Sequence, residues 1–510
     1  MGRRARQTGW AWALSTTLGA CGADAAAPGP SPSDTAGPPP SFELVGTPTL
    51  SLPEGTRAFG VHQLTVATTA PTTATVRIDD LCGRRDVHFP AQATEHVLDV
   101  RGLHLGEPSE VSVLLTDADG GQRTVPVTTV TPVVPEGLPT IEVLTHEPTA
   151  MAPGLLVVAP QSQAGTEWVL VLDEALHLVH ALPLAFEDLR LHDGQWLGLH
   201  DDLALRLDLY GRELASLGKP AWGLNHELFP LPDGDMLVLD RAVEEVSDYP
   251  VDAEATETGP ATVISQGVVR ISPEGELGER FTLFDVLPTS VVGYKSVEAL
   301  ETEAKDWTHA NAVVPYGDDA YLVSVRHLDV VAAVSRDGEL RWLLGDPTGW
   351  PSPYVERFLT PVGELTWPRH QHALELQPDG QTVVMFDNRT FAGSPRAPAP
   401  DDAETVSRGV AFRVDEAAGT VEQLWEVEHE GLFTYAMGDA DVLGSTGLVQ
   451  LVFSRVAQPQ LHTRLVQRPI DGGPAVLDLA IGRDVPRWTY RATVVPTLYG
   501  PEVTVEHTRR

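Results

Sequence analysis

Three histidines occupy the same place in a short phrase that recurs along the chain. His226, His309 and His372 are each the second residue of such a phrase, and a glycine follows each of them after eight positions. The phrases are NHELFPLPDG, THANAVVPYG and QHALELQPDG. Imidazole donates and accepts protons near neutral pH and also binds metal ions. Three equivalent histidines therefore indicate acid–base chemistry or a metal site of the three-histidine zinc type.

The phrases belong to a repeat of short strands and tight turns, and long helical periodicity is absent. Turn signals such as HDG, PDG and YGDD precede strand-like runs, which is typical of a β-propeller. Five units begin near Asp188, Asn225, Thr308, Gln371 and Tyr435. A sixth would join the strands of residues 155–182 to the strand that begins at Trp488, which removes two exposed sheet edges. The sequence therefore predicts an all-β chain with a six-bladed β-propeller over residues 140–510. Seven blades stay open if residues 242–264, expected as a long loop, contain strands.

The repeat predicts where the three histidines lie relative to one another. In a propeller the innermost strand of each blade lines the central channel, so equivalent positions form a ring. We therefore expect the three imidazoles to converge at one mouth of the channel. The neighbouring units carry Phe186 and Asp439 at this position, so histidine is not a structural signature of the repeat. The alternative, in which each histidine only serves its turn, stays open.

Residues 42–135 form a smaller unit ahead of the repeat. Short runs rich in Val, Thr and Leu alternate with turn signals such as Asp119-Gly120-Gly121. This pattern predicts a small antiparallel β-sandwich of the immunoglobulin-like type. Its histidines share no common flanking sequence and are interpreted as solvent-facing or sandwich-edge residues. They are His62, His88, His96 and His104.

The beginning of the chain has the order of an export signal. Basic residues precede a short apolar run that ends in Leu18-Gly19-Ala20-Cys21, which resembles a bacterial lipobox and predicts a signal peptide over residues 1–21. Cys21 would then be acylated, and an ordinary cleaved signal without lipid is the alternative. Residues 22–41 are rich in Pro and Ala and are predicted to be a tether. We expect an exported protein, periplasmic or anchored to the outer membrane, that contacts the membrane only through this lipid.

The composition excludes one class of partner. The chain has 510 residues, 42% of them hydrophobic, which is ordinary for a folded protein. Its formal net charge of −36 repels phosphate backbones, so we expect no nucleic-acid surface. A small anionic substrate is compatible with this charge, because exposed charges are screened beyond roughly 8 Å at physiological salt.

Six phrases in the propeller region resemble the bacterial arylsulfate sulfotransferase (ASST) family. They are DWTHANAV, VSVRH, GELRWLLGDPTGWP, LTPVG, QHALELQPDG and VVMFDN, and the likeness is strongest from Asn225 to Trp425. The resemblance implies a six-bladed propeller with a small N-terminal β-sandwich in an exported protein. It also implies transfer of a sulfuryl group from an aryl sulfate to a phenolic acceptor, without a cofactor and without the nucleotide sulfate donor PAPS.

The resemblance further implies roles for individual residues. In the family a histidine is transiently sulfated, so that catalysis is ping-pong, and the QHA phrase makes His372 the expected nucleophile. Arg326 is expected to fork two hydrogen bonds onto sulfuryl oxygens. His226 or His309, if protonated, is expected to donate a proton to the leaving phenolate and then to take one from the acceptor. Asn311 is expected to bind the substrate.

Neighbouring residues are interpreted by strand alternation. His370 lies two positions before His372, so alternation does not exclude it and it stays an alternative nucleophile. Thr308 and His327 are each one position from an expected site residue, and alternation turns both away from the channel. The nearby tryptophans are interpreted as packing residues; they are Trp307, Trp342, Trp350 and Trp367.

Two functions of other classes also stay open. A lipid-tethered propeller could bind a ligand or partner without turnover, because the fold alone does not decide function. The three histidines could instead hold a metal ion, but Arg326 argues against this, since a guanidinium repels a metal cation. A homodimer is likewise left open.

Overall fold

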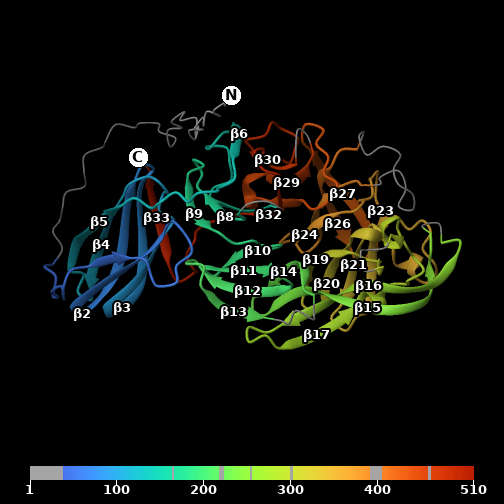
Figure 1. The fold of residues 1–510 in the computed structure, drawn as a ribbon, viewed down its shortest axis with the longest axis horizontal. Helices are drawn as coiled ribbons and strands as arrows, with labels where there is room; N and C mark the ends of the chain where they lie inside the picture. The colour runs from blue at the N-terminus through green and yellow to red at the C-terminus, as the bar shows by residue number, and fades with distance from the viewer. Residues whose placement is uncertain are drawn as a thin grey trace, which may run out of the picture.

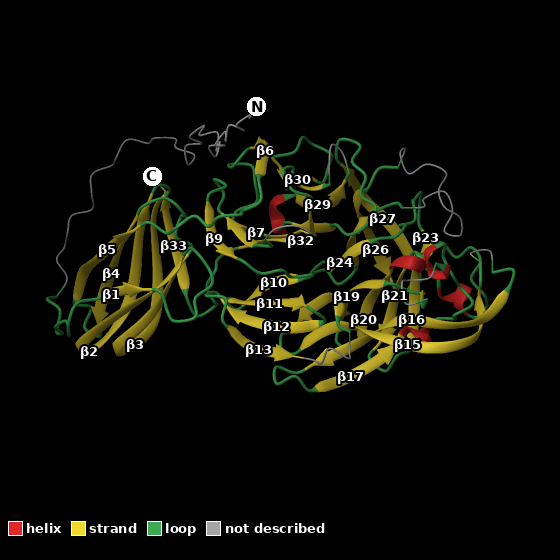
Figure 2. Cartoon of the chain, in the orientation of Figure 1, coloured by secondary structure: helices red, strands yellow, loops and turns green. Residues whose placement is uncertain are grey.

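The computed structural model describes residues 38–162, 166–217, 223–252, 255–298, 303–390, 405–457 and 461–509. The predicted all-β class is confirmed for these residues (Figure 1). Helix is confined to short turns (Figure 2), namely α1 (Leu283–Val286), η2 (Lys295–Val297), η3 (Arg326–Leu328), η4 (Tyr354–Arg357) and η6 (Gly444–Thr446). Within the described residues, none of these helices is long and apolar enough to cross a membrane.

The N-terminal unit is a six-stranded antiparallel sheet, drawn in blue and red at the left of Figure 1. Its strands are β1 (Thr49–Ser51), β2 (Val61–Asp80), β3 (Gly83–Arg101), β4 (Ser109–Asp117), β5 (Gln122–Val130) and β33 (Thr504–Arg509). The last of these comes from the C-terminal end of the chain and pairs with β3 from Gly83 to His88. The expected boundary of the propeller is therefore corrected: residues 504–509 belong to the N-terminal sheet.

The rest of the described chain forms six further sheets. The first contains β10 (Leu189–His192), β11 (Gln195–His200), β12 (Leu203–Asp208) and β13 (Glu213–Leu217). The second contains β14 (Asn225–Pro230), β15 (Met236–Pro250), β16 (Thr258–Ile271), β17 (Leu277–Thr282) and β18 (Lys305–Asp306). The third contains β19 (Ala310–Tyr316), β20 (Ala320–Val325), β21 (Val330–Ser335) and β22 (Leu340–Gly345). The fourth contains β23 (Thr360–Pro361), β24 (His372–Leu376), β25 (Thr382–Asp387), β26 (Arg408–Asp415) and β27 (Thr420–Glu428).

The last two sheets join the two ends of the propeller region. The fifth contains β28 (Asp439–Val442), β29 (Leu448–Val456), β30 (His462–Pro469), β31 (Leu477–Ile481) and β6 (Ile141–His146). The sixth contains β32 (Arg487–Val495), β7 (Leu155–Ser162), β8 (Val169–Leu172) and β9 (Leu178–Leu182). The predicted closure by strands from both ends is confirmed, because β32 pairs with β7. The six sheets agree with the expected count of blades, which itself stays a prediction.

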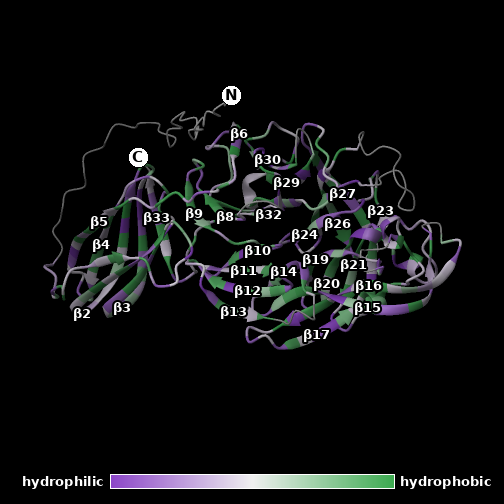
Figure 3. Cartoon of the chain, viewed as in Figure 1, coloured by the Kyte–Doolittle hydropathy of each residue, from purple (hydrophilic) through white to green (hydrophobic). Residues whose placement is uncertain are grey.

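The innermost strands of successive sheets contact one another around a central axis. Strand β14 contacts β19, β19 contacts β24, β24 contacts β28, and β28 contacts β32. The first sheet closes the circle, because its β10 contacts β32 and its β11 contacts β14. Hydrophobic clusters fill the spaces between neighbouring sheets; one, for example, joins Val323 of the third sheet to Leu239 of the second. Hydrophobic residues, green in Figure 3, are spread along these strands. The side chains between sheets supply the core, and those at the inner strands face the axis.

Residues 242–264 are not the long loop that the sequence indicates. Most of them extend β15 and β16, which pair from Met236↔Ile271 to Val246↔Ala261 and again at Tyr249↔Gly259. The strand residues Glu244 and Glu245 are exposed, as is Val243, so the segment lacks the half-buried alternation by which a strand is usually recognised.

A buried arginine links three inner strands. Arg491 of β32 pairs with Asp188 at 3.0 Å, with Glu227 of β14 at 3.0 Å and with Asp439 of β28 at 3.3 Å. All four side chains are at most 5% exposed. Because removing one partner of a buried ion pair leaves uncompensated charge, Arg491→Ala is expected to lower the free energy of unfolding by about 3–5 kcal/mol.

Denaturant unfolding of the full chain measures this effect. The matched control is Arg413→Ala, since Arg413 forms an exposed pair with Glu422 at 3.5 Å. Exposed pairs contribute little, so the control is expected to change stability by less than about 1 kcal/mol. Equal losses in the two variants would show that the Arg491 network does not hold the inner strands together.

Candidate active site

The three histidine phrases share a backbone geometry as well as a sequence. His226 lies in β14, His309 directly precedes β19 and His372 begins β24. At each of these points the pairing of the inner strand with its neighbour shifts register. His226 and His309 have positive φ angles of 65° and 44°; His372 does not, but His370, just before the third phrase, has 52° and Ala373, within it, has 50°. Left-handed backbone is uncommon outside glycine and concentrates at functional sites.

Four of the histidine rings form a continuous series. The ring centroids of His226 and His309 are 4.8 Å apart, and those of His309 and His327 are 4.6 Å apart with the planes inclined by only 19°. The series continues to His370, whose centroid lies 5.7 Å from that of His327. The predicted convergence of His226 and His309 is therefore observed, and His327 lies between His309 and His370.

The orientation predicted for His327 is wrong. Strand β20 ends at Val325, and Arg326–Leu328 form a 3-10 turn, so the alternation of a strand no longer applies. The His327 side chain is buried, with Nδ1 2.8 Å from the carbonyl oxygen of Asp306 and Nε2 2.9 Å from Nη1 of Arg326. These contacts fix the neutral tautomer that carries the proton on Nδ1, because the guanidinium can only donate.

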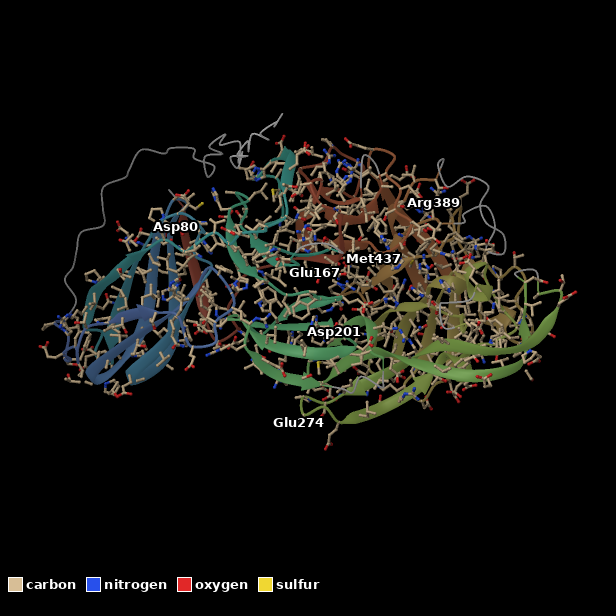
Figure 4. All side chains as sticks on the ribbon, in the orientation of Figure 1. Asp80, Glu167, Asp201, Glu274, Arg389 and Met437 are labelled. Carbon is tan, nitrogen blue, oxygen red and sulfur yellow. The ribbon has the colours of Figure 1, made fainter. Side chains whose placement is uncertain are left out.

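His372 is held in one tautomer at the start of β24. Its Nδ1 lies 2.6 Å from Oδ1 of Asn388, whose amide nitrogen donates to the carbonyl oxygens of Thr434 and Met437. The backbone N–H of Met437 donates to Nε2 of His372 at 3.2 Å. Oδ1 of Asn388 therefore accepts the N–H at Nδ1, and Nε2 carries no proton. Met437 is labelled near the centre of the ring of sheets in Figure 4.

The electrostatic environment keeps His372 neutral. Burial, followed by the positive charge of Arg326, holds its pKa well below the ordinary value of 6.5. His309 and His226 add smaller contributions of the same sign. A neutral imidazole with an unprotonated Nε2 is a nucleophile or a base, so His372 can attack an electrophile once the electrophile displaces the N–H of Met437 from Nε2.

Arg326 is a buried cation without a carboxylate partner. Its side chain donates to Nε2 of His327 and, at 3.4 Å, to the carbonyl oxygen of Tyr435. Within the described part of the chain it forms no ion pair, and its buried Nε has no hydrogen-bond partner. Burial lowers its pKa, although Tyr435 and Asp306 oppose the shift. Because a buried charge is costly unless paired, the geometry favours an anion beside this guanidinium.

His309 is oriented by a carboxylate. Its Nδ1 lies 2.5 Å from Oδ2 of Asp306, so the proton on Nδ1 points to Asp306 and Nε2 faces the other way. Burial lowers the pKa of His309, while Asp306 opposes the shift. Asp306 itself has a lowered pKa because His309 outweighs the effect of its burial. His226 also lies beside a carboxylate, with Nδ1 3.0 Å from Oε1 of Glu187.

Asn311 and Tyr490 complete the wall of the cluster. Asn311 is fully buried; its side-chain amide nitrogen donates to the carbonyl oxygen of Gln371 at 2.8 Å, and its backbone carbonyl oxygen accepts from the Tyr490 hydroxyl at 3.0 Å. No protein partner is found for Oδ1 of Asn311 among the described residues. The Tyr490 ring lies parallel to that of His226, with centroids 6.2 Å apart, and 6.5 Å from that of His372. The expected site residues of the propeller therefore meet in one cluster.

An exposed aromatic ring borders the cluster. Tyr435 is 39% exposed, and the guanidinium carbon of Arg326 lies 6.0 Å from its ring centroid. The Lys295 ammonium lies 5.9 Å from the same centroid. In contrast, Trp307, Trp342 and Trp350 are at most 8% exposed, which agrees with the interpretation of these tryptophans as packing residues. An aromatic ligand would therefore meet Tyr435 before it reached Arg326.

A metal ion fits this cluster poorly. Asp306, His309 and His327 place ligand atoms within 4.8 Å of one another. Both ring nitrogens of His327 are already engaged, however, and Arg326 donates directly to one of them. A guanidinium at this distance repels a cation. The donor set therefore favours an anion.

The remaining expected residue, Cys21, falls outside the described residues. Sequence reasoning missed Asp306, Asn388 and Tyr490 as parts of the site. Asp306 and Asn388 lie within phrases DWTHANAV and VVMFDN, so their positions were visible although their contacts were not.

Comparison with known proteins gives a consistent result. The family model described as Arylsulfotransferase (ASST) matches residues 140–467, which include all five expected site residues of the propeller. Arylsulfate sulfotransferase AssT of Escherichia coli O6:H1 is 28% identical over 144 residues, and that of Lelliottia amnigena is 26% identical over 144 residues. Each alignment covers 25% of this chain and 23% of the relative, so the chain spans about a quarter of the length of the curated relatives it matches.

Solved structures resemble the chain only distantly. A protein of unknown function from Bacteroides caccae has 13% identity and a TM-score of 0.39, covering 66% of this chain and 99% of its own. Virginiamycin B lyase of Staphylococcus aureus has 9% identity and a TM-score of 0.31, covering 68% of this chain and 99% of its own.

Proposed function

Because the chain belongs to the arylsulfotransferase family, we propose that it transfers a sulfuryl group from an aryl sulfate to a phenolic acceptor without a nucleotide sulfate donor. The observation that carries this proposal is the buried, carboxylate-free guanidinium of Arg326 among neutral histidines. An aryl sulfate supplies the anion that this cation lacks, and its ring suits the exposed Tyr435.

In the first half of the reaction, Nε2 of His372 attacks the sulfur of the donor. A nitrogen–sulfur bond forms while the bond between sulfur and the phenolic oxygen breaks, and the electron pair leaves with the phenolate. Negative charge develops on the sulfuryl oxygens and on the leaving oxygen, where fixed donors lower the barrier. The proposed donors are Arg326, whose charge acts on His372, and the amide N–H of Met437, which lies 3.2 Å from Nε2.

His309 is the proposed proton donor to the leaving phenolate. Asp306 holds its Nδ1, so Nε2 is the atom that faces away and can exchange a proton. A bound sulfate ester is an anion, and an anion nearby raises the pKa of a histidine. Binding of the donor would therefore favour the protonated form of His309, with His226 as the second candidate.

The second half reverses these steps on the acceptor. A phenol gives its proton to His309, and the resulting phenolate oxygen attacks the sulfur carried by His372. The oxygen–sulfur bond forms, the nitrogen–sulfur bond breaks and neutral His372 is restored. Such a cycle has a covalent intermediate and is ping-pong.

Initial-rate kinetics with purified protein test this proposal. An aryl sulfate with a chromogenic phenol is the donor, a second phenol is the acceptor, and the sulfated product is detected directly. We expect parallel lines in double-reciprocal plots at several acceptor concentrations. Saturable binding of the donor with no product would instead favour a propeller that binds without turnover. Converging lines would favour direct transfer between the two substrates.

The pH dependence of kcat/KM follows from the lowered pKa of His372. Only the neutral form attacks, and kcat/KM reports the free enzyme. Since the pKa of His372 lies well below 6.5, the loss of activity on the acid side of the profile is expected only below pH 6.5. Removing the positive charge with Arg326→Met should raise the pKa of His372 and move this decline to higher pH. A wild-type midpoint at or above 6.5, or a shift to lower pH in the variant, would contradict the assignment.

We also propose that the protein is exported and carries a lipid on Cys21. The lipobox-like sequence before this cysteine supports the proposal. Labelling of cells with a radioactive fatty acid tests it, because the label should be lost in a Cys21→Ser variant and kept in Cys82→Ser. A label that persists without Cys21 would refute the proposal.

A further inference from the structure

Four side chains with metal-binding atoms meet where the N-terminal sheet contacts the propeller. Cys82 lies in the turn between β2 and β3, and His104 follows β3. Asp173 and His177 lie in the turn between β8 and β9 of the propeller. The group is distinct from the candidate active site, and each residue offers a ligand atom within 4.8 Å of the others. His104, expected at the solvent or the sandwich edge, is 3% exposed.

The separations between the ligand atoms suit a tetrahedral ion. Sγ of Cys82 lies 3.8 Å from Oδ2 of Asp173 and 3.7 Å from Nδ1 of His177. The Asp173 oxygen lies 3.3 Å from Nδ1 of His177 and 2.9 Å from Nε2 of His104. Zinc bonds of about 2.0–2.3 Å imply tetrahedron edges of roughly 3.3–3.8 Å. Three of the four measured edges therefore have the length of a zinc tetrahedron, and the fourth is slightly shorter.

Surrounding contacts aim the ligand atoms toward a common centre. Oδ1 of Asp173 accepts the backbone N–H groups of Ala175 at 2.9 Å and His177 at 2.8 Å, which leaves Oδ2 for the cluster. The second nitrogen of His104, Nδ1, lies 3.3 Å from Oδ2 of Asp80. A carboxylate behind a metal-binding histidine is the usual outer partner of zinc sites. Figure 4 labels Asp80, the last residue of β2.

We propose that Cys82, His104, Asp173 and His177 bind a divalent transition metal, with zinc as the best fit, and so fasten the N-terminal sheet to the propeller. One thiolate, two imidazoles and one carboxylate suit zinc, whereas calcium and magnesium prefer oxygen ligands. Four protein ligands fill a tetrahedron, which is typical of structural zinc. Binding releases the thiol proton of Cys82 to solvent, and no electron is transferred.

The two parts of the chain are already in close contact beside this site. The backbone N–H of Leu105 donates to the carbonyl oxygen of Leu178 at 2.9 Å, and Phe59 forms a bridge with Ala181. A Cβ atom on Gly60 would lie 2.2 Å from the carbonyl oxygen of Val179, so the backbones touch there. The fold therefore brings the ligands together, and a bound metal would further stabilise the contact between the N-terminal sheet and the propeller.

A second cluster serves as a comparison within the same molecule. His429, Glu430 and Asp478 also place ligand atoms close together. Arg464 donates to both carboxylates of that cluster, so a guanidinium already provides the positive charge. No arginine makes such a contact with Asp173 among the described residues. We therefore expect the His429 cluster to remain metal-free.

Cobalt spectroscopy on the purified full chain tests the proposal. After removal of metals with a chelator, one equivalent of Co²⁺ should produce the near-ultraviolet charge-transfer band of a thiolate–cobalt bond, and Zn²⁺ should displace it. Cys82→Ser should abolish the band, whereas Cys21→Ser and His429→Gln should keep it. His177→Gln, at a partly exposed position, should weaken binding, and Asp80→Asn should weaken it about 10–100-fold.

Thermal unfolding gives a second readout, since a ligand that binds only the folded state raises Tm. Zn²⁺ should raise the Tm of the wild type and not that of Cys82→Ser. The proposal is overturned if no stoichiometric binding is found, if the band persists in Cys82→Ser, or if Co²⁺ binds without a thiolate band. In that case His104 between Asp80 and Asp173 is an ion-pair cluster only.

Discussion

Replacing His372 with alanine is expected to reduce sulfuryl transfer by at least about 10⁴-fold, because the covalent intermediate can no longer form. The fold should survive, since the substitution removes only two hydrogen bonds, the one from His372 to Asn388 and the one from the backbone N–H of Met437 to His372. Transfer from aryl sulfate to phenol, measured at saturating donor, reports the loss. Binding of the donor should change little, because Arg326 stays in place.

The control for this variant is His370→Gln. His370 is buried in the same cluster, and its backbone N–H donates to Asp329 at 2.7 Å, a bond that the substitution keeps. Its pKa is lowered by burial and by Arg326, as for His372, so the two histidines differ mainly in their partners. If His370 were the nucleophile, His370→Gln would be inactive and His372→Ala active.

The second large effect is expected at Arg326. Arg326→Met keeps an unbranched apolar stem but removes the guanidinium charge proposed to face the sulfuryl oxygens, and kcat/KM is expected to fall about 10²–10³-fold. The variant should not lose stability, because no carboxylate among the described residues would be left unpaired. Arg326→Lys keeps the charge without the two-pronged geometry and should be intermediate.

Stability and activity together separate this role from a structural one. If Arg326 merely supported the fold, both Arg326→Met and Arg326→Lys would lower Tm in parallel with activity. Arg413→Ala, the exposed control, should change neither quantity. Unchanged kcat/KM in Arg326→Met would remove the observation on which the proposed function rests.

The ring of histidines is predictable from the sequence because equivalent positions of a propeller repeat face the same axis. Local periodicity also predicts the closure of the ring, because the strands of residues 155–182 and the strand that begins at Trp488 are left over once the five units are counted, and β32 does pair with β7. Pairing of β33 with β3 is not predictable in this way, because the two strands are separated by the whole propeller. The β15–β16 hairpin is missed because its acidic, exposed residues carry no apolar alternation.

The site is only partly predictable for a similar reason. Alternation fails at His327 because the strand ends one residue before Arg326 and a 3-10 turn redirects the chain. Asn388 and Met437 fix the tautomer of His372 from two other loops, and no local pattern joins them to it. The cluster around Cys82 likewise unites three segments that are far apart in sequence, so its ligands have no shared motif.

Mass spectrometry of the protein after exposure to donor without acceptor tests the central claim most directly. Trypsin should release a peptide that spans residues 370–389 and contains both His370 and His372. The account predicts a mass increment of one sulfuryl group on this peptide, localised to His372 by fragmentation and lost when a phenol is added. If active protein shows no such increment, or if fragmentation places it on His370, His372 is not the sulfated nucleophile.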